Sequence, residues 1–189
     1  MQKILCLALL VVSALVFIYS LGIMTDLYDA LYSTIRSAKN LDKSSVTGSR
    51  VYYDMQDFNK LFLRLSIAMI LLCVTLFVTN THNRRKYYIG NYCSIALVSA
   101  GGIAFAIWAH GQIELYKAQF LNINFEELAE HAAKRKTLYT ESTFWFDIHY
   151  LLFGLLVVGI VLMIANAIWK RKLMKEEQAL IAGGKEAAA

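Results

Sequence analysis

Four long apolar runs, separated by charged segments, constrain this chain more than any other feature of its sequence. A bilayer core about 30 Å thick requires roughly 20 mostly apolar residues in a helix. On this criterion we predict spans at about 4–24, 61–78, 89–109 and 146–169. Because the chain contains no proline, each span can run as an unbroken helix. The sequence therefore predicts an all-α membrane protein, a four-transmembrane-helix bundle.

The composition and the first run support a membrane protein rather than a secreted soluble one. The chain is 58% hydrophobic, above the roughly 45–50% of an ordinary soluble domain. Lys3 and the apolar run that follows it could also be read as a signal peptide. However, this run is longer than a typical signal-peptide core, and no small-x-small cleavage site follows it. We therefore predict an uncleaved first span.

The basic residues predict the orientation of the bundle. The connection between the second and third runs carries three basic residues and no acid, and four more follow the fourth run. These seven residues are Arg84, Arg85, Lys86, Lys170, Arg171, Lys172 and Lys175. Ten further basic residues lie in or beside the two long connections, which join the first run to the second and the third to the fourth. They are spread out there and accompanied by eleven acids. The positive-inside rule then favours both termini in the cytoplasm of a cell (plasma or inner) membrane.

The charged segments divide the chain into a membrane domain and a short tail. We expect the membrane domain to cover 1–175, with outer connections at 25–60 and 110–145. After Trp169 we expect a helical cytoplasmic extension. The tail at 176–189 is small, polar and rich in glycine and alanine, so we expect it to be cytoplasmic and partly disordered, from about Ile181 onward. The three cysteines all fall in apolar runs, and the outer connections contain neither a cysteine nor an N-glycosylation sequon. These two absences favour a bacterial inner membrane.

The first outer connection is predicted to contain a short amphipathic helix. Apolar and aromatic side chains recur at helical spacing from Leu27 to Ile35, which is typical of a helix at a membrane surface. The polar stretch at 40–50 is predicted to be an exposed turn. Helix should then resume near Tyr53 and continue into the second span.

The second outer connection is predicted to be helical as well. The third span should continue past the bilayer as far as Phe120. Asn124 followed by Glu127 is a variant of the capping box, which opens a helix. Phe125, Leu128 and Ala132 would lie on one face of that helix, because their spacing follows the helical repeat. Both pairs of spans are therefore predicted to be joined outside by helical elbows.

Small residues on the third span predict close helix contacts. One ladder of four-residue spacing contains Gly90, Ser94, Gly102 and Ala106, and a second contains Ala96, Ala100 and Ala104. Small side chains let helix backbones approach each other in lipid. Packing of this helix against the other three spans of the chain would explain one such face. A second small face suggests contact with another subunit, and we assign partner binding to the first ladder.

An outer polar cluster is predicted where the spans reach the outer membrane face. Its members are ionisable residues at one level: Asp26, Arg64, His110, Glu114, Asp147 and His149. Intramembrane charges are usually paired, so the cluster is either an interfacial salt-bridge network, with Arg64 and Asp147 as partners, or a ligand site. In the second case His110 and His149 would be axial ligands of a haem.

The cysteines are predicted to be packing residues. Cys6, Cys73 and Cys93 share a level, and three thiolates could bind zinc or copper(I). None belongs to a C-x-x-C motif, and a single cysteine in an apolar helix usually packs as a small residue. From the sequence we therefore assign no metal site, no catalytic residue and no cofactor.

These features predict the function only indirectly. Ordered outer elbows, two small faces and no recognisable catalytic motif favour a non-catalytic accessory or scaffolding subunit of a larger membrane complex, in particular a transporter. Its partners would be other integral membrane subunits, an extracytoplasmic protein at the outer connections and anionic lipid at the basic inner face. We expect no nucleic acid. The alternative is a redox protein that binds haem or quinone at the outer polar cluster, and a small channel or carrier is a third possibility.

Overall fold

The computed structural model of this protein describes residues 1–23, 51–82, 88–135 and 140–186. The described part contains five α-helices and no strand. They are α1 (Gln2–Gly22), α3 (Val51–His82), α4 (Ile89–Leu121), α5 (Phe125–Arg135) and α6 (Phe144–Glu186). The fold is therefore all-α, as predicted.

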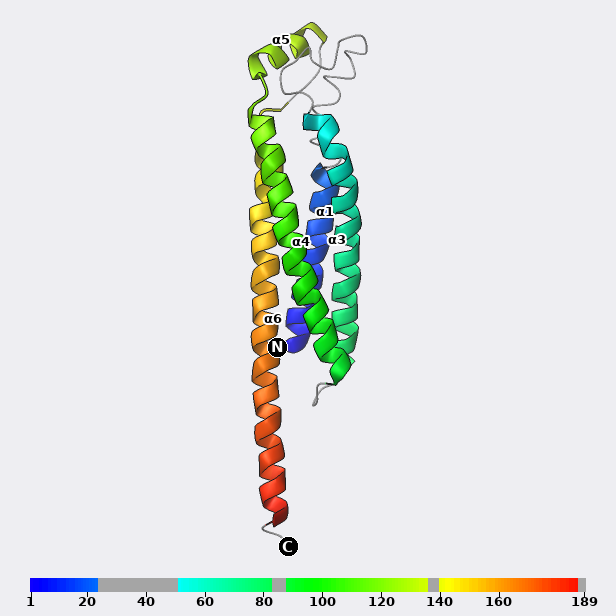
Figure 1. The fold of residues 1–189 in the computed structure, drawn as a ribbon, viewed down its shortest axis with the longest axis vertical. Coiled ribbons are helices and arrows are strands. Elements are labelled where there is room, and N and C mark those ends of the chain that lie inside the picture. Colours follow the sequence, from blue (N-terminus) through cyan, green and yellow to red (C-terminus); the bar gives the residue numbers. More distant parts are fainter. Residues whose placement is uncertain (24–50, 83–87, 136–139, 187–189) are drawn as a thin grey trace.

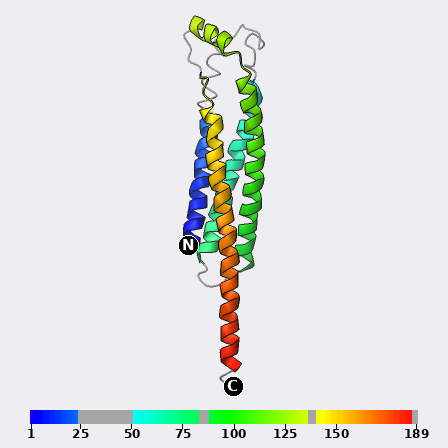
Figure 2. The ribbon, with the colours of Figure 1, turned by 90° about the vertical axis from the view of Figure 1, so that its left-hand side faces the viewer.

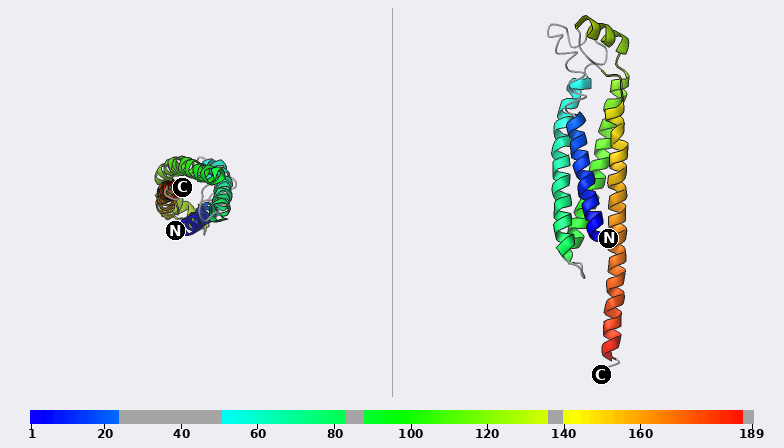
Figure 3. Two further views of the ribbon diagram at one scale, coloured as in Figure 1. Left: turned by 90° about the horizontal axis from the view of Figure 1, so that it is seen from below. Right: turned by 180° about the vertical axis from the view of Figure 1, so that it is seen from behind.

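The four long helices form an up-and-down bundle (Figure 1). α1 packs against α3 and α6, and α4 packs against the same two helices. α1 and α4 therefore lie on one diagonal of the bundle, and α3 and α6 on the other, as the view along the bundle shows (Figure 3). α5 lies across one end of the bundle, here called the α5 end (Figure 2). The opposite end, here called the termini end, carries the start of α1 and the continuation of α6.

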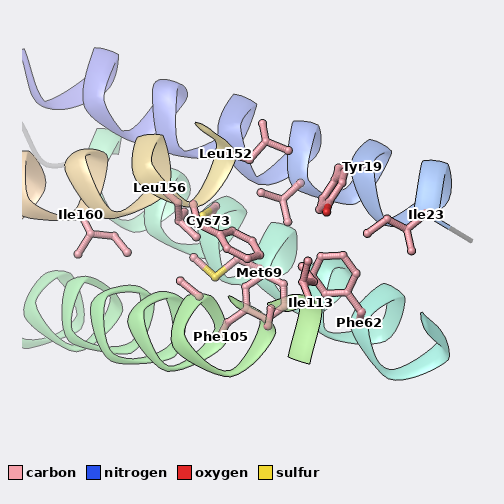
Figure 4. Close-up of a cluster of buried hydrophobic side chains, with 14 of the residues drawn as sticks. Tyr19, Ile23, Phe62, Met69, Cys73, Phe105, Ile113, Leu152, Leu156 and Ile160 are labelled. Carbon is pink, nitrogen blue, oxygen red and sulfur yellow. The ribbon is translucent and has the colours of Figure 1, made fainter. Parts of the chain in front are cut away.

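The core is built from side chains that recur every three or four residues. On α3 the buried residues include Phe58, Phe62, Met69, Cys73 and Leu76. This spacing places them on one stripe that packs against neighbouring helices at small crossing angles. Figure 4 shows Phe62, Met69 and Cys73 among side chains from the other three helices.

The outer surfaces of the bundle are apolar too. Leu71 is 62% exposed and Val158 is 56% exposed, although both lie in the middle of long helices. Contiguous apolar surface of this kind is not stable in water but suits the hydrocarbon of a bilayer. The structure accordingly has four helices that are long and apolar enough to cross a membrane, within Gln2–Gly22, Asp54–Thr81, Ile89–Leu121 and Phe144–Gly183.

The second outer connection has the predicted helices. α4 continues to Leu121, and the backbone N–H of Glu127 donates to the Asn124 side-chain oxygen at 3.3 Å. Leu128 and Ala132 are buried on one side of α5. The capping residue and the buried face predicted from the sequence are therefore confirmed.

Two other expectations have a different outcome. The amphipathic helix at Leu27–Ile35 and the turn at 40–50 lie outside the described residues. The tail, expected to be disordered beyond about Ile181, is helical as far as Glu186, and residues 187–189 lie outside the described part of the chain. Its run of Glu, Gln, Ala and Leu residues has high helix propensity, so a helix that starts in the membrane continues beyond it.

Candidate functional site

Three side chains with metal- or proton-binding groups converge at the α5 end, and we call them the His–Glu cluster: His110, Glu114 and His149. His110 and Glu114 are four residues apart on α4, so they lie on one face of that helix. His149 comes from the neighbouring α6. His110 Nδ1 lies 2.8 Å from His149 Nε2, and the same His149 nitrogen lies 3.8 Å from Glu114 Oε1.

The orientation of His149 is fixed from the opposite side of its ring. Its side chain is completely buried, and Nδ1 donates a hydrogen bond to the backbone carbonyl of Phe146. A neutral imidazole has one donor and one acceptor nitrogen. With its proton on Nδ1, His149 presents an Nε2 lone pair to the cluster, and His110 Nδ1–H is the donor in the bond between the two rings.

Glu114 is also held by a second residue. The Tyr150 hydroxyl donates to Glu114 Oε1 at 2.7 Å. The Tyr150 ring lies against both imidazoles, with centroid distances of 5.7 Å to His110 and 4.2 Å to His149. Tyr150 therefore positions the carboxylate and covers one side of the cluster.

A separate ion pair lies beside the His–Glu cluster. Lys117 of α4 pairs with Asp147 of α6, and the Thr143 hydroxyl donates to the second Asp147 oxygen at 2.7 Å. The Lys117 ammonium also lies 5.6 Å from the centre of the Tyr150 ring. The two side chains are partly exposed, and the pair joins α4 to α6.

The predicted outer polar cluster is thus assembled only in part. Four members, His110, Glu114, Asp147 and His149, lie together on α4 and α6. The predicted partnership of Arg64 with Asp147 is wrong. Arg64 is exposed on α3, which lies diagonally opposite α6, and Asp147 pairs with Lys117 instead. Asp26 lies outside the described residues.

The geometry does not fit a haem held between His110 and His149. Two imidazoles on opposite sides of one metal ion have their ligating nitrogens about 4 Å apart, twice a metal–imidazole bond. These nitrogens are 2.8 Å apart and share a hydrogen bond. No porphyrin plane fits between them without moving α4 from α6.

The small residues of α4 divide between the interior and the surface. Ser94, Gly102 and Ala106 are buried in the chain's own bundle, whereas Gly90 is exposed. A Cβ on Gly102 would lie 2.7 Å from the Ile160 side chain and 2.9 Å from that of Met69. The assignment of this ladder to partner binding is therefore corrected, because intramolecular packing already occupies three of its four residues. The second ladder, Ala96, Ala100 and Ala104, is exposed.

A polar network at the termini end was not predicted. Asn80 of α3 is its centre: its Oδ1 accepts from Gln2 at 3.0 Å, and its Nδ2 donates to the Ser94 hydroxyl at 2.9 Å. Lys170 of α6 donates to Gln2 Oε1 at 2.8 Å, and Asn91 Nδ2 donates to the Thr79 carbonyl at 2.8 Å. All four long helices are thus joined. Asn91 lies inside the predicted third span and Asn80 just after the predicted second span, and neither was singled out from the sequence.

The cysteines do not form a common site in the structure. Cys6 and Cys73 are buried, whereas Cys93 is exposed on α4. The Cys73 sulfur lies 3.1 Å from the Ser13 hydroxyl, a contact that joins α1 to α3. Buried cysteines of this kind act as small packing residues.

The fold and its apolar surface define a multi-pass helical membrane protein. Comparisons with protein-family models, with curated proteins and with solved structures found no match to this chain. The residues themselves therefore carry the functional argument.

Proposed function

We propose that this chain is a non-catalytic accessory or scaffolding subunit of a larger membrane complex, in particular of a transporter. The observation that carries the proposal is the continuation of α6. At the termini end this helix extends well past the other three (Figure 1). Leu173 is 51% exposed and Leu180 is 78% exposed there, and their spacing of seven residues places them on one face of the helix.

A single helix with an exposed apolar face needs something to cover that face. Isolated helices of this length are marginal in water, and most helical stability comes from packing of an apolar face. Glu176 and Glu177 follow Leu173 by three and four residues, so they lie between the two leucines on this side of the helix, and Lys172 and Lys175 lie further around it. Such a pattern suits an amphipathic helix of a partner subunit, packed alongside α6 with its own charges opposite these.

The membrane-facing side of α4 supports the same proposal. Ala96, Ala100 and Ala104 are exposed and form a shallow stripe at four-residue spacing. Within a bilayer such a stripe lets a second transmembrane helix approach closely. The partner we propose is therefore an integral membrane subunit, with one helix against this stripe and a cytoplasmic segment against α6.

The proposal includes a location and an orientation. The termini end carries the dense basic residues, so we place it in the cytoplasm of a plasma or inner membrane, next to anionic lipid. The α5 end then faces outward, where α5 and the second outer connection would receive an extracytoplasmic partner. A fusion reporter that is active only outside the cytoplasm tests this, and activity at the C-terminus would contradict it.

The experiment that tests the proposed function is purification of the native protein in a mild detergent, followed by mass spectrometry of the proteins that accompany it. We expect the subunits of one transporter in fixed stoichiometry. Ala100→Leu should reduce their recovery at least several-fold. Ala100 is exposed, so the same variant should keep its elution volume and melting temperature. A chain that purifies alone under every mild condition would contradict the proposal.

The alternative, a haem- or quinone-binding redox protein, is tested in the same sample. A bis-imidazole haem would give an intense visible spectrum that His110→Ala removes. The 2.8 Å separation of the two ligand nitrogens argues against that haem. A quinone does not require ligation, and extraction of the purified protein with organic solvent would detect it.

A further inference from the structure

We propose that His110, Glu114 and His149 bind one divalent transition-metal ion between α4 and α6, with zinc as the best match. The site is independent of the proposed accessory function, because its test does not involve a partner. Two imidazoles and a carboxylate are the ligands of several zinc sites that keep a fourth position open. The same ligand types also suit other divalent ions of the first transition row.

The distances between the ligand atoms fit a metal ion. One nitrogen from each histidine and one carboxylate oxygen all lie within 4.8 Å of one another. Ligand atoms about 2.0–2.2 Å from a tetrahedral zinc ion are about 3.3 Å apart. The separations of 2.8 Å between the two nitrogens and 3.8 Å between His149 and Glu114 differ from this by about 0.5 Å each. Small side-chain rotations are enough to admit the ion.

The surrounding hydrogen bonds are those of a metal site. A ligating histidine usually donates its other ring N–H to a carbonyl or carboxylate, which fixes the tautomer. His149 does this with the Phe146 carbonyl. Ligating carboxylates are hydrogen-bonded in turn, and Tyr150 donates to Glu114 at 2.7 Å. The two outer partners are therefore already in place for two of the three ligands.

The protonation states also permit binding. His149 already presents its Nε2 lone pair. His110 must transfer its proton from Nδ1 to Nε2, and because this side chain is exposed the new N–H does not have to be buried inside the bundle. The ion would thus replace one hydrogen bond between the rings by two metal–nitrogen bonds. Glu114 supplies one negative charge, and the nearby Lys117 is neutralised by Asp147, so the cluster does not repel a cation.

The site would join α4 to α6 near one end of the bundle. His149 is completely buried whereas His110 is exposed, so the ion would approach the site from the His110 side. Three protein ligands leave a coordination position for water or for a group from a partner. Binding should therefore raise the melting temperature of the protein.

The test uses the full-length protein carrying an affinity tag without histidine. The detergent-solubilised protein is stripped with a chelator, dialysed against zinc chloride, and assayed for zinc by elemental mass spectrometry. Cobalt(II) serves as a second probe, because its visible absorption reports the ligand geometry. We expect one zinc ion per chain, a cobalt spectrum typical of a four-coordinate ion, and a higher melting temperature with zinc than without.

The variants decide whether these residues hold the ion. His110→Ala and Glu114→Gln change residues that are not fully buried, and we expect each to lower zinc affinity at least tenfold. Glu126→Gln removes an exposed carboxylate from the first turn of α5 and should bind zinc as the unmodified chain does. Wild-type protein that binds no zinc, or variants that bind it with unchanged affinity, would overturn the site and leave a hydrogen-bond network in its place.

Discussion

At the scale of single residues, buried polar side chains hold this bundle in register. Asn80 is 2% exposed and contacts both Gln2 of α1 and Ser94 of α4. The apolar side chains around it have no directional preference, whereas these hydrogen bonds exist in one arrangement only. Polar side chains between membrane helices contribute about 0.6–2 kcal/mol each.

We predict that Asn80→Ala lowers the free energy of unfolding by about 1–2 kcal/mol, because it removes the acceptor of the Gln2 amide N–H and one of the bonds that join α3 to α4. Unfolding in detergent with increasing denaturant measures this. Thr75→Ala is the matched control, since the Thr75 hydroxyl is exposed and bonds only to the Leu71 carbonyl of its own helix. Equal losses for the two variants would contradict a special role for the network.

Tyr150 carries a prediction about the His–Glu cluster. Tyr150→Phe removes only the hydroxyl that positions Glu114. Loss of such an outer hydrogen bond typically costs 10–100-fold in metal affinity, so zinc binding should weaken by about tenfold or more. Because Tyr150 is 50% exposed, the melting temperature without zinc should not change. A lower melting temperature with unchanged zinc affinity would show that Tyr150 is only a packing residue.

At the scale of the helix, α4 has an inner and an outer small face, and the two should respond differently to the same substitution. Gly102→Leu places a large side chain against Ile160 and Met69, and overpacking of this kind costs about 1–3 kcal/mol. Ala100→Leu adds the same bulk to an exposed position and should leave stability unchanged. Thermal unfolding of both variants in one detergent is the comparison, and a greater loss for Ala100→Leu would reverse the assignment of the faces.

Helix α4 also shows which features of the structure could be predicted from the sequence and which could not. Both small ladders of α4 are visible in the sequence, because four-residue spacing fixes which residues share a face. Which face lies inside depends on the rotation of α4 against α3 and α6, which no local pattern records. The partner of Asp147 was missed because Arg64 lies on the diagonally opposite helix and deeper in the bundle. Phe62, two residues before Arg64, packs against Phe105 and Phe153, whereas Asp147 pairs with Lys117. His110 and His149 were correctly brought to one level by their positions in the spans, whereas their direct contact was not foreseeable.

At the scale of the whole molecule, the bundle and the extension of α6 should be separable. The hydrogen bond between Lys170 and Gln2 joins α6 to α1 at the termini end, and we expect deletion of residues 176–189 to spare it. We predict that this deletion leaves the melting temperature of the bundle unchanged while co-purification of partner subunits falls. Calorimetry and mass spectrometry on the same preparation measure both. A chain that loses stability but keeps its partners would contradict the division.

The all-α fold could be predicted from the sequence because few kinds of backbone structure can cross a bilayer. Backbone groups in hydrocarbon must be satisfied internally, so long apolar runs become helices. The helical extension of the fourth span was expected, but it ends later than predicted, at Glu186 rather than near Ile181, because composition alone does not fix where a helix ends. The function we propose was not predictable at the scale of the fold, since the proposal rests on apolar and small-residue surfaces rather than on a reactive group.

The most direct test of the account is photo-crosslinking in living cells from a photoreactive amino acid placed at Ala100. We predict one discrete product that contains a subunit of a transporter, together with little product from the same probe at Leu151, an exposed position on α6. Products that contain only lipid or a second copy of this chain would contradict the claim that α4 presents its small outer face to a partner subunit.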